Sequence, residues 1–222
     1  VFTGPRLLEI GGGPIIMYVA AACTRFPEII FSEYSEQSRQ SVKCWIENDK
    51  HAFDWSHRIK YICTLEGNGD KWQERSENLR CSIKEIVHCD VHVDNPLAPN
   101  QYDPFDAIVT ALCLEAACPD KASYSNAMRN VASLLKPGGV LFLCGVLNQS
   151  FYAVGANKYW TLSIDEVFIK SAMTDAGFID IESSVIPAPN PDGNNVSDFG
   201  GLIYITAKKN GQNTIENESA HE

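Results

Sequence analysis

The chain has 222 residues and a net charge of −10, from 18 Lys and Arg against 28 Asp and Glu. This length suits one sizeable α/β domain, no stretch approaches the roughly 20 apolar residues of a membrane span, and no cluster of basic residues offers a nucleic-acid surface. We therefore expect a soluble monomer that binds neither membrane nor nucleic acid. The acidic balance suits a small, cationic substrate.

Eight cysteines are spread along the chain, and none forms a C-x-x-C pair. A chain of this length does not need disulfides to fold, so we expect reduced, mostly buried thiols and a cytoplasmic protein. The segment His88-Cys89-Asp90-Val91-His92 contains residues of the metal-ligand type. Alternate residues of a strand point to opposite faces, so we predict no metal site there.

The most informative stretch is Leu7-Leu8-Glu9-Ile10-Gly11-Gly12-Gly13-Pro14. It predicts a buried strand, a turn of three glycines and a helix from Ile15 to Cys23, with Pro14 at the first helical position. Glycines at such a turn allow positive φ angles and let a ligand lie against the main chain. The stretch therefore indicates a nucleotide site, with a Gly-rich turn of some other α/β protein as the alternative.

The spacing of the glycines limits which kind of nucleotide the turn can bind. A dinucleotide fingerprint needs a third glycine where Ile16 stands, which disfavours an NAD oxidoreductase, and a Walker loop needs a Lys that is absent. Glu33 closes the next apolar run, 22 residues after Gly11. At about that distance an acidic side chain reaches ribose hydroxyls. A ligand with a ribose and no phosphate to bind suits S-adenosylmethionine.

Strands and helices alternate along the rest of the chain, which predicts a doubly wound, mainly parallel sheet with helices on both faces. No Ser/His/Asp or Cys/His hydrolase motif is present. The predicted strands are 7–10, 29–32, 86–89, 105–110, 140–146, 179–186 and 202–207, and the predicted helices are 15–23, 35–48, 72–86, 124–134 and one from a capping box at 163–166 to Gly177, with 49–70 irregular.

In such a sheet the ligand lies beyond the carboxyl ends of the strands. Pattern alone places five residues there: Gly11, Glu33, Asp90, Ala111 and Gly145. Asp90 can accept from an adenine amino group, and Tyr34 can stack on the base. The alternative for Asp90 is an aspartate that caps a turn.

Several stretches resemble one family, the class I S-adenosylmethionine-dependent N-methyltransferases of small amines, which include the nicotinamide, phenylethanolamine and indolethylamine enzymes. They are Ile10-Gly11-Gly12-Gly13-Pro14, Ala52-Phe53-Asp54-Trp55-Ser56, Cys89-Asp90-Val91-His92, Leu112-Cys113-Leu114-Glu115-Ala116 and Leu135-Lys136-Pro137-Gly138-Gly139. The resemblance implies a Rossmann-like, seven-stranded sheet with an antiparallel last strand. It covers a methyltransferase domain over 1–208, without the family's N-terminal lid helices, and leaves a disordered polar tail over 209–222.

The resemblance also implies a cofactor site for S-adenosylmethionine, with S-adenosylhomocysteine as the product and no metal. Gly11, Gly12 and Gly13 would back the methionine part, Glu33 and Ser38 would bind the ribose, and Tyr34 would flank the adenine. Asp90 and Val91 would read the adenine edge, and Ala111 would line the cofactor. The sequence departs from the family pattern at Gly12, Ile15, Met17, Glu33 and Ser38.

For the substrate, the resemblance points to Glu115, Tyr152, Gln149, Gly145 and Asp198. Gly145 and Glu115 favour an amine over a pyridine, whereas Gln149 stands where the phenylethanolamine enzymes carry Glu. We hypothesise that Glu115 is the main catalytic carboxylate, which binds an ammonium and takes its proton, with Asp198 as helper. The alternative function is a catalytically idle domain that binds the cofactor or a partner.

Overall fold

The computed structural model describes residues 2–189 and 196–211 and shows a seven-stranded sheet with the order β3-β2-β1-β4-β5-β9-β8. The first five strands in this order are parallel, and β9 is antiparallel to both of its neighbours. The predicted doubly wound sheet with a reversed last strand is thus confirmed. The strands are β1 Arg6–Ile10, β2 Glu28–Glu33, β3 Ile83–His88, β4 Phe105–Ala111, β5 Leu135–Leu147, β8 Phe178–Pro187 and β9 Gly201–Lys209.

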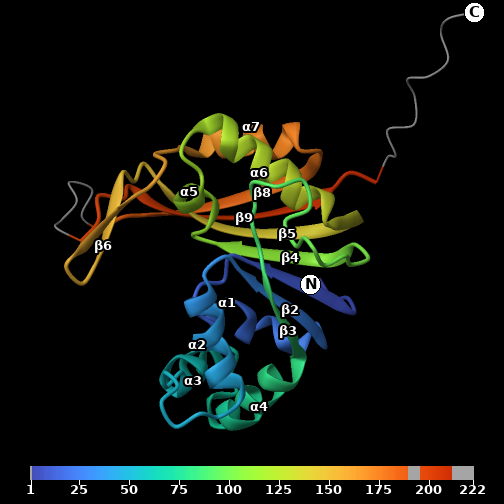
Figure 1. Cartoon of the computed structure of the whole chain (residues 1–222), viewed down its shortest axis with the longest axis vertical. Coiled ribbons are helices and arrows are strands. Elements are labelled where there is room, and N and C mark those ends of the chain that lie inside the picture. Colours follow the sequence, from blue (N-terminus) through green and yellow to red (C-terminus); the bar gives the residue numbers. More distant parts are fainter. Residues whose placement is uncertain (1, 190–195, 212–222) are drawn as a thin grey trace, which may run out of the picture.

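Helices cover the two faces of the sheet. In Figure 1, α6 and α7 lie above the sheet and α2 to α4 lie below it. Each layer has its own core, since Leu8 and Ile10 pack with α6 and α7 while Leu7 packs with α1 to α4. The helices are α1 Met17–Ala20, α2 Glu36–Ile46, α3 Ser56–Leu65, α4 Trp72–Ser82, α5 Leu114–Ala117, α6 Lys121–Ser133 and α7 Glu166–Asp175, with 3-10 turns at Ala22–Thr24 and Gly69–Lys71.

The first helix is shorter than the sequence predicts. The turn at Gly11 to Gly13 continues through Pro14, the N–H of Ile15 bonds to the carbonyl of Gly12, and α1 begins only at Met17. The side chain of Ile16, at the N-cap position, is apolar and cannot accept a hydrogen bond from the first helical N–H groups. The predicted helix over 15–23 therefore forms as two short pieces.

Three other predictions differ from the structure. The helix expected over 72–86 ends at Ser82, because the β-branched residues that follow pair with β2 as β3. The stretch 49–70 contains α3, whose buried face is only Ile59 and Cys63 and gives a weak periodic signal. The last helix begins at Glu166, with the side chain of Asp165, not Ser163, accepting from the N–H of Phe168 at 2.7 Å.

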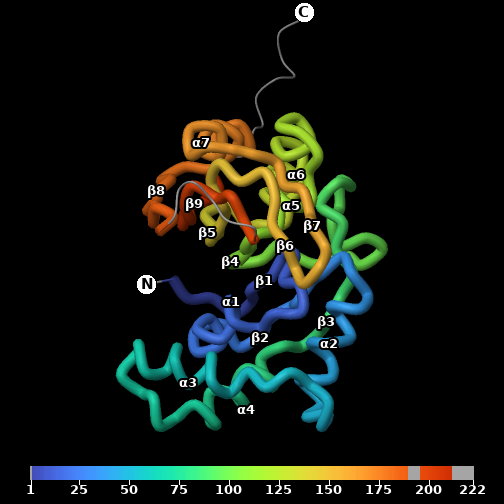
Figure 2. Tube along the Cα trace, turned by 90° about the vertical axis from the view of Figure 1, so that its left-hand side faces the viewer, coloured from blue at the N-terminus to red at the C-terminus, as the bar shows by residue number. Residues whose placement is uncertain are grey.

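A β-hairpin between β5 and α7 was not predicted. Its strands are β6 Phe151–Val154 and β7 Asn157–Trp160, and Figure 2 shows it as a narrow loop leaving the sheet. Most of its side chains are at least partly exposed, with Trp160 71% exposed, so it lacks the alternation of buried and exposed residues that reveals a strand. Residues 196–198 run beside β6, through a bridge between Tyr152 and Ser197.

Within residues 2–189 and 196–211, no helix is long and apolar enough to cross a membrane. All eight cysteines are described, and each is a free thiol. Lys209 is the last residue of β9. The greater part of the predicted tail, from 212 onward, lies outside the described residues.

Candidate functional site

A cavity of about 560 Å³ lies at the carboxyl ends of the first four parallel strands. Its volume falls within the usual range for a small-molecule site, roughly 300–1,000 Å³. Seven of the predicted site residues line it: Gly11, Gly13, Glu33, Tyr34, Asp90 and Val91 of the cofactor set and Tyr152 of the substrate set, which comes from the hairpin. Of the five residues that the strand-end pattern named, Gly11, Glu33 and Asp90 line this cavity, whereas Ala111 and Gly145 do not.

The carboxylate of Glu33 ties the glycine turn to the end of β2. One oxygen, Oε2, accepts the N–H of Gly13 at 2.9 Å, and Oε1 accepts the N–H of Ser35 at 2.8 Å. Each carboxylate oxygen has two acceptor positions, so both keep capacity for a further donor such as a ribose hydroxyl. Ser35 also caps α2 through its side chain, which accepts the N–H of Ser38 at 3.3 Å.

Gly11 and Gly13 both have left-handed backbones, with φ angles of +66° and +61°. A Cβ on Gly11 would lie 2.1 Å from the Sγ of Cys113, whereas a Cβ on Gly13 would meet no atom within 4 Å. Gly11 is thus required for close packing of β1 against the β4 loop. Gly13 leaves space open beside the cavity.

The adenine end of the predicted site is built from the ends of β2 and β3. The Tyr34 ring is 65% exposed and lies 5.2 Å from the His88 ring. Asp90 accepts the N–H of His92 through Oδ1, as a turn-capping aspartate does, and it also lines the cavity. Asp90 is therefore a turn-capping aspartate, and its contact with an adenine amino group stays a prediction.

Three predicted cofactor residues do not line this cavity. Gly12 lies behind it, where a Cβ would come within 2.3 Å of the Phe31 ring. Ser38 lies in the first turn of α2, and Ala111 lines a different groove. Their roles in binding the cofactor stay predictions.

Sequence reasoning missed cavity residues in the loop after β4. Leu112 has a left-handed backbone at φ 55°, unusual for a branched side chain, and it lines the cavity with Cys113, Ala116 and Ala117. Burial raises the pKa of the Cys113 thiol well above its ordinary value, so this thiol stays protonated. The motif around Leu114 marks this loop in the sequence, but nothing in it reveals the backbone strain.

Glu115 is the buried acid next to this loop. It is 4% exposed, and its Oε1 accepts the N–H of Val146 at 3.0 Å. A Cβ on Gly145 would lie 3.5 Å from the same oxygen, so the two predicted substrate residues are neighbours. Burial raises the pKa of Glu115, and the bond from Val146 opposes this only in part.

The remaining substrate residues cluster at the base of the hairpin. Asp198 accepts the N–H of Ser150 at 2.9 Å and that of Phe151 at 3.2 Å, and its other oxygen accepts the Ser150 hydroxyl. Burial raises the pKa of Asp198, but these hydrogen bonds outweigh it and lower the pKa overall. Gln149 is buried and donates to the Ser197 hydroxyl at 2.7 Å. Both side chains therefore fasten the segment that carries Tyr152.

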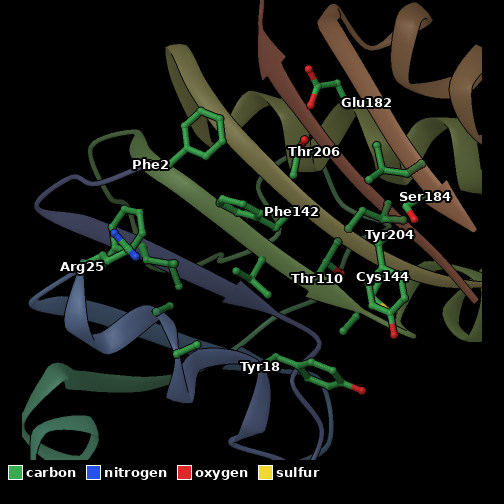
Figure 3. Close-up of a pocket in the computed structure, with 18 of the residues that line it drawn as sticks. Phe2, Tyr18, Arg25, Thr110, Phe142, Cys144, Glu182, Ser184, Tyr204 and Thr206 are labelled. Carbon is green, nitrogen blue, oxygen red and sulfur yellow. The ribbon is translucent and has the colours of Figure 1, made fainter. Parts of the chain in front are cut away.

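A second, larger hollow of about 680 Å³ lies on the α1 face of the sheet (Figure 3). Phe2 and Phe142 line one part of it, with ring centroids 5.6 Å apart, and Tyr18, Cys144 and Tyr204 gather at another part. Burial raises the pKa of Tyr18 to about 12. Apart from Ala111 it contains no predicted site residue, so we place the candidate site in the smaller cavity, where the glycine turn and Glu33 meet.

Comparison with known proteins identifies the family of the chain. Residues 2–210 match the NNMT/PNMT/TEMT family. Human nicotinamide N-methyltransferase is 40% identical over 175 residues, 79% of this chain and 66% of that protein. Rabbit indolethylamine N-methyltransferase is 36% identical over 93% of this chain and 78% of its own length. Phenylethanolamine N-methyltransferase of Macaca mulatta is 34% identical over 94% of this chain and 75% of its own length.

Solved structures match the fold. An S-adenosylmethionine-dependent methyltransferase from Methanosarcina mazei superposes with a TM-score of 0.65 at 14% identity, over 96% of this chain and 95% of that one. A Burkholderia thailandensis 1,6-didemethyltoxoflavin-N1-methyltransferase, solved with S-adenosylhomocysteine, superposes with a TM-score of 0.56 at 16% identity. The match covers 94% of this chain and 72% of that one. The fold is that of the class I methyltransferases. The chain belongs to the NNMT/PNMT/TEMT family of S-adenosylmethionine-dependent N-methyltransferases.

Proposed function

We propose that the protein transfers a methyl group from S-adenosylmethionine to the nitrogen of a small amine or a pyridine-type substrate. The observation that carries this proposal is that one cavity is lined by the glycine turn, by the carboxylate of Glu33 and by the ring of Tyr34. Glu115 does not itself line this cavity; it is buried on α5, between the lining residues Cys113 and Ala116. The names of the relatives support the reaction class.

The residues present fit the cofactor. Glu33 keeps acceptor capacity for two ribose hydroxyls, Tyr34 offers a ring for the adenine, and Asp90 offers an acceptor for the adenine amino group. Gly11 and Gly13 let the chain approach the methionine part closely. When bound, S-adenosylmethionine supplies a methyl group on a sulfonium whose departure as a neutral thioether needs no acid.

On the substrate side we propose Glu115 as the group that holds and deprotonates an ammonium. An aliphatic amine arrives mainly as a cation, and a cation beside Glu115 favours the ionised carboxylate that burial alone disfavours. The carboxylate can then take the proton that must leave before the nitrogen attacks. A pyridine nitrogen carries no such proton, so it needs no base.

The other task of the protein is to orient the nitrogen. Holding two reacting groups in attack geometry can supply roughly 7–11 kcal/mol of the barrier at best. We propose that Tyr152 contacts the substrate from the hairpin and that Gly145 leaves room for it beside Glu115. Gln149 and Asp198, given their hydrogen bonds, would act by holding the hairpin in place.

We further propose a cytoplasmic monomer without a metal or nucleic-acid partner. Eight free thiols suit a reducing compartment, and the net charge of −10 disfavours phosphate backbones. No observation on the described residues favours the alternative of a catalytically idle domain.

The test is a methyl-transfer screen with isotopically labelled S-adenosylmethionine over aliphatic amines, arylalkylamines and pyridines. We expect labelled product from one of these classes. Binding of S-adenosylhomocysteine without transfer to any nitrogen compound would contradict the proposed reaction and leave a binding domain.

A further inference from the structure

One arginine joins the ends of β2 and β3, next to the cavity residues Glu33 and Tyr34. A single guanidinium nitrogen of Arg39, Nη1, donates to the carbonyl of Glu33 at 2.7 Å and to the carbonyl of Tyr34 at 2.6 Å. The same nitrogen lies 3.3 Å from Nδ1 of His88 at the end of β3. Arg39 itself stands in the first turns of α2, so it fixes three elements at once.

These contacts converge on groups that face the cavity. Glu33, whose carbonyl accepts from Arg39, grips the N–H of Gly13 with its carboxylate. The carbonyl of Tyr34 is the second acceptor, and the Tyr34 ring contacts the His88 ring. The arginine therefore sets the direction of the backbone from which both the acid and the ring project.

We infer that Arg39 is a positioning residue for the adenosine half of the cofactor, an inference that rests on the proposed function. Arg39 touches neither the glycine turn nor Glu115 in any contact of residues 2–189 and 196–211. Its effect should thus be confined to the ribose and adenine and leave the substrate side unchanged.

The chemistry of the contact favours this role over that of an ordinary surface arginine. In the described part of the chain Arg39 forms no ion pair with an acid, although the protein carries an excess of acids. Its guanidinium instead donates to two main-chain carbonyls, and such charge-assisted hydrogen bonds are stronger than neutral ones. The two N–H groups of Nη1 account for the two carbonyl acceptors.

The test compares Arg39→Met with Arg80→Met. Arg80 is a matched control, since its Nε donates to the carbonyl of Trp45 at 3.1 Å and its guanidinium lies 4.2 Å from the Trp45 ring, away from the cavity. Calorimetry measures the affinity for S-adenosylhomocysteine and for 5′-methylthioadenosine, which lacks the amino-acid part. Thermal unfolding reports the cost of each change to the fold.

We expect Arg39→Met to weaken both ligands by a similar factor, about tenfold, because both carry the adenosine that the arginine positions. Arg39→Lys should recover part of this loss, the KM for the nitrogen substrate should stay unchanged, and Arg80→Met should bind both ligands as the unchanged protein does. Unaltered affinity in Arg39→Met would overturn the inference. Failure of the unchanged protein to bind either ligand would overturn the proposed function instead.

Discussion

Glu115 accepts the main-chain N–H of Val146 at 3.0 Å, and this bond joins α5 to the end of β5. It places a buried carboxyl beside Gly145, at the point where the sheet meets the loops of the candidate site. An acid so deeply buried costs folding free energy when it ionises. A cationic substrate beside Glu115 would supply the positive partner that the surrounding residues do not, which would explain an acid at this buried position.

The first prediction concerns that acid. Glu115→Gln keeps the shape and an acceptor for Val146 but removes the base, so turnover of an aliphatic amine should fall by about 10² or more. Turnover of any pyridine substrate should change little. Steady-state kinetics with both classes measures the difference, with Glu74→Gln as the exposed control on α4. Unchanged amine turnover in Glu115→Gln would refute the assignment.

The second prediction separates two glycines of the turn. Gly11→Ala forces a Cβ to within 2.1 Å of Cys113 Sγ in a left-handed backbone, so it should cost about 2 to 5 kcal/mol of folding free energy. Gly13→Ala meets open space, so it should cost only the strain of about 1 to 2 kcal/mol. Its methyl group should nevertheless reduce the affinity for S-adenosylhomocysteine by about tenfold.

Gly177→Ala is the control for backbone strain, since its φ is +86° with nothing within 4 Å of the added Cβ and it lies at the end of α7. Denaturant unfolding and calorimetry check all three variants. If Gly13→Ala and Gly177→Ala bind the ligand equally well, the turn does not contact the cofactor.

The third prediction concerns Glu9, the acid of the first strand. It is fully buried, and neither carboxylate oxygen has a hydrogen-bond partner in the described part of the chain. Burial raises its pKa well above the ordinary value, so the folded state keeps a proton that the unfolded state loses above about pH 4.3. The free energy of unfolding should therefore fall as pH rises from there through the folded pKa.

Glu9→Gln cannot ionise, so the difference in unfolding free energy, variant minus unchanged protein, should grow with pH. Urea titrations between pH 4 and pH 8 measure it. A difference that is constant across this range would show that Glu9 ionises in the folded state as it does in water.

The fourth prediction concerns the hairpin. Asp198→Ala removes the acceptor for Ser150 and Phe151, so β6 and Tyr152 should lose their fixed position. We expect the KM for the nitrogen substrate to rise about threefold to tenfold, with the affinity for S-adenosylhomocysteine unchanged. Asp180→Ala, which breaks an exposed ion pair with Lys208, is the control. A rise in KM that the control shares would rule out a specific role for Asp198.

The sheet could be predicted from the sequence because its strands are short, apolar and bounded by turn residues. The strand ends then followed from topology, which is why Gly11, Glu33 and Asp90 meet as expected. The helix predicted over 15–23 forms as two shorter pieces because its start at Ile16 is uncapped, and α3 was missed because its buried face is narrow.

The hairpin and the loop after β4 could not be found in the same way. The exposed hairpin is held by contacts with residues 196–198, more than 40 positions away. The left-handed backbone of Leu112 and the clamp of Arg39 on Glu33 also depend on tertiary packing. Local pattern carries no signal for such contacts.

The central claim is that S-adenosylmethionine binds at the cavity where Glu33 holds the glycine turn. Calorimetric titration of S-adenosylhomocysteine into the protein and into Glu33→Gln tests it most directly, with Glu36→Gln as the control on the exposed first turn of α2. The account predicts one binding site per chain and a loss of about tenfold or more in Glu33→Gln, whose amide would face the N–H donors of Gly13 and Ser35. Absence of binding to the unchanged protein, or equal affinity in Glu33→Gln, would contradict it.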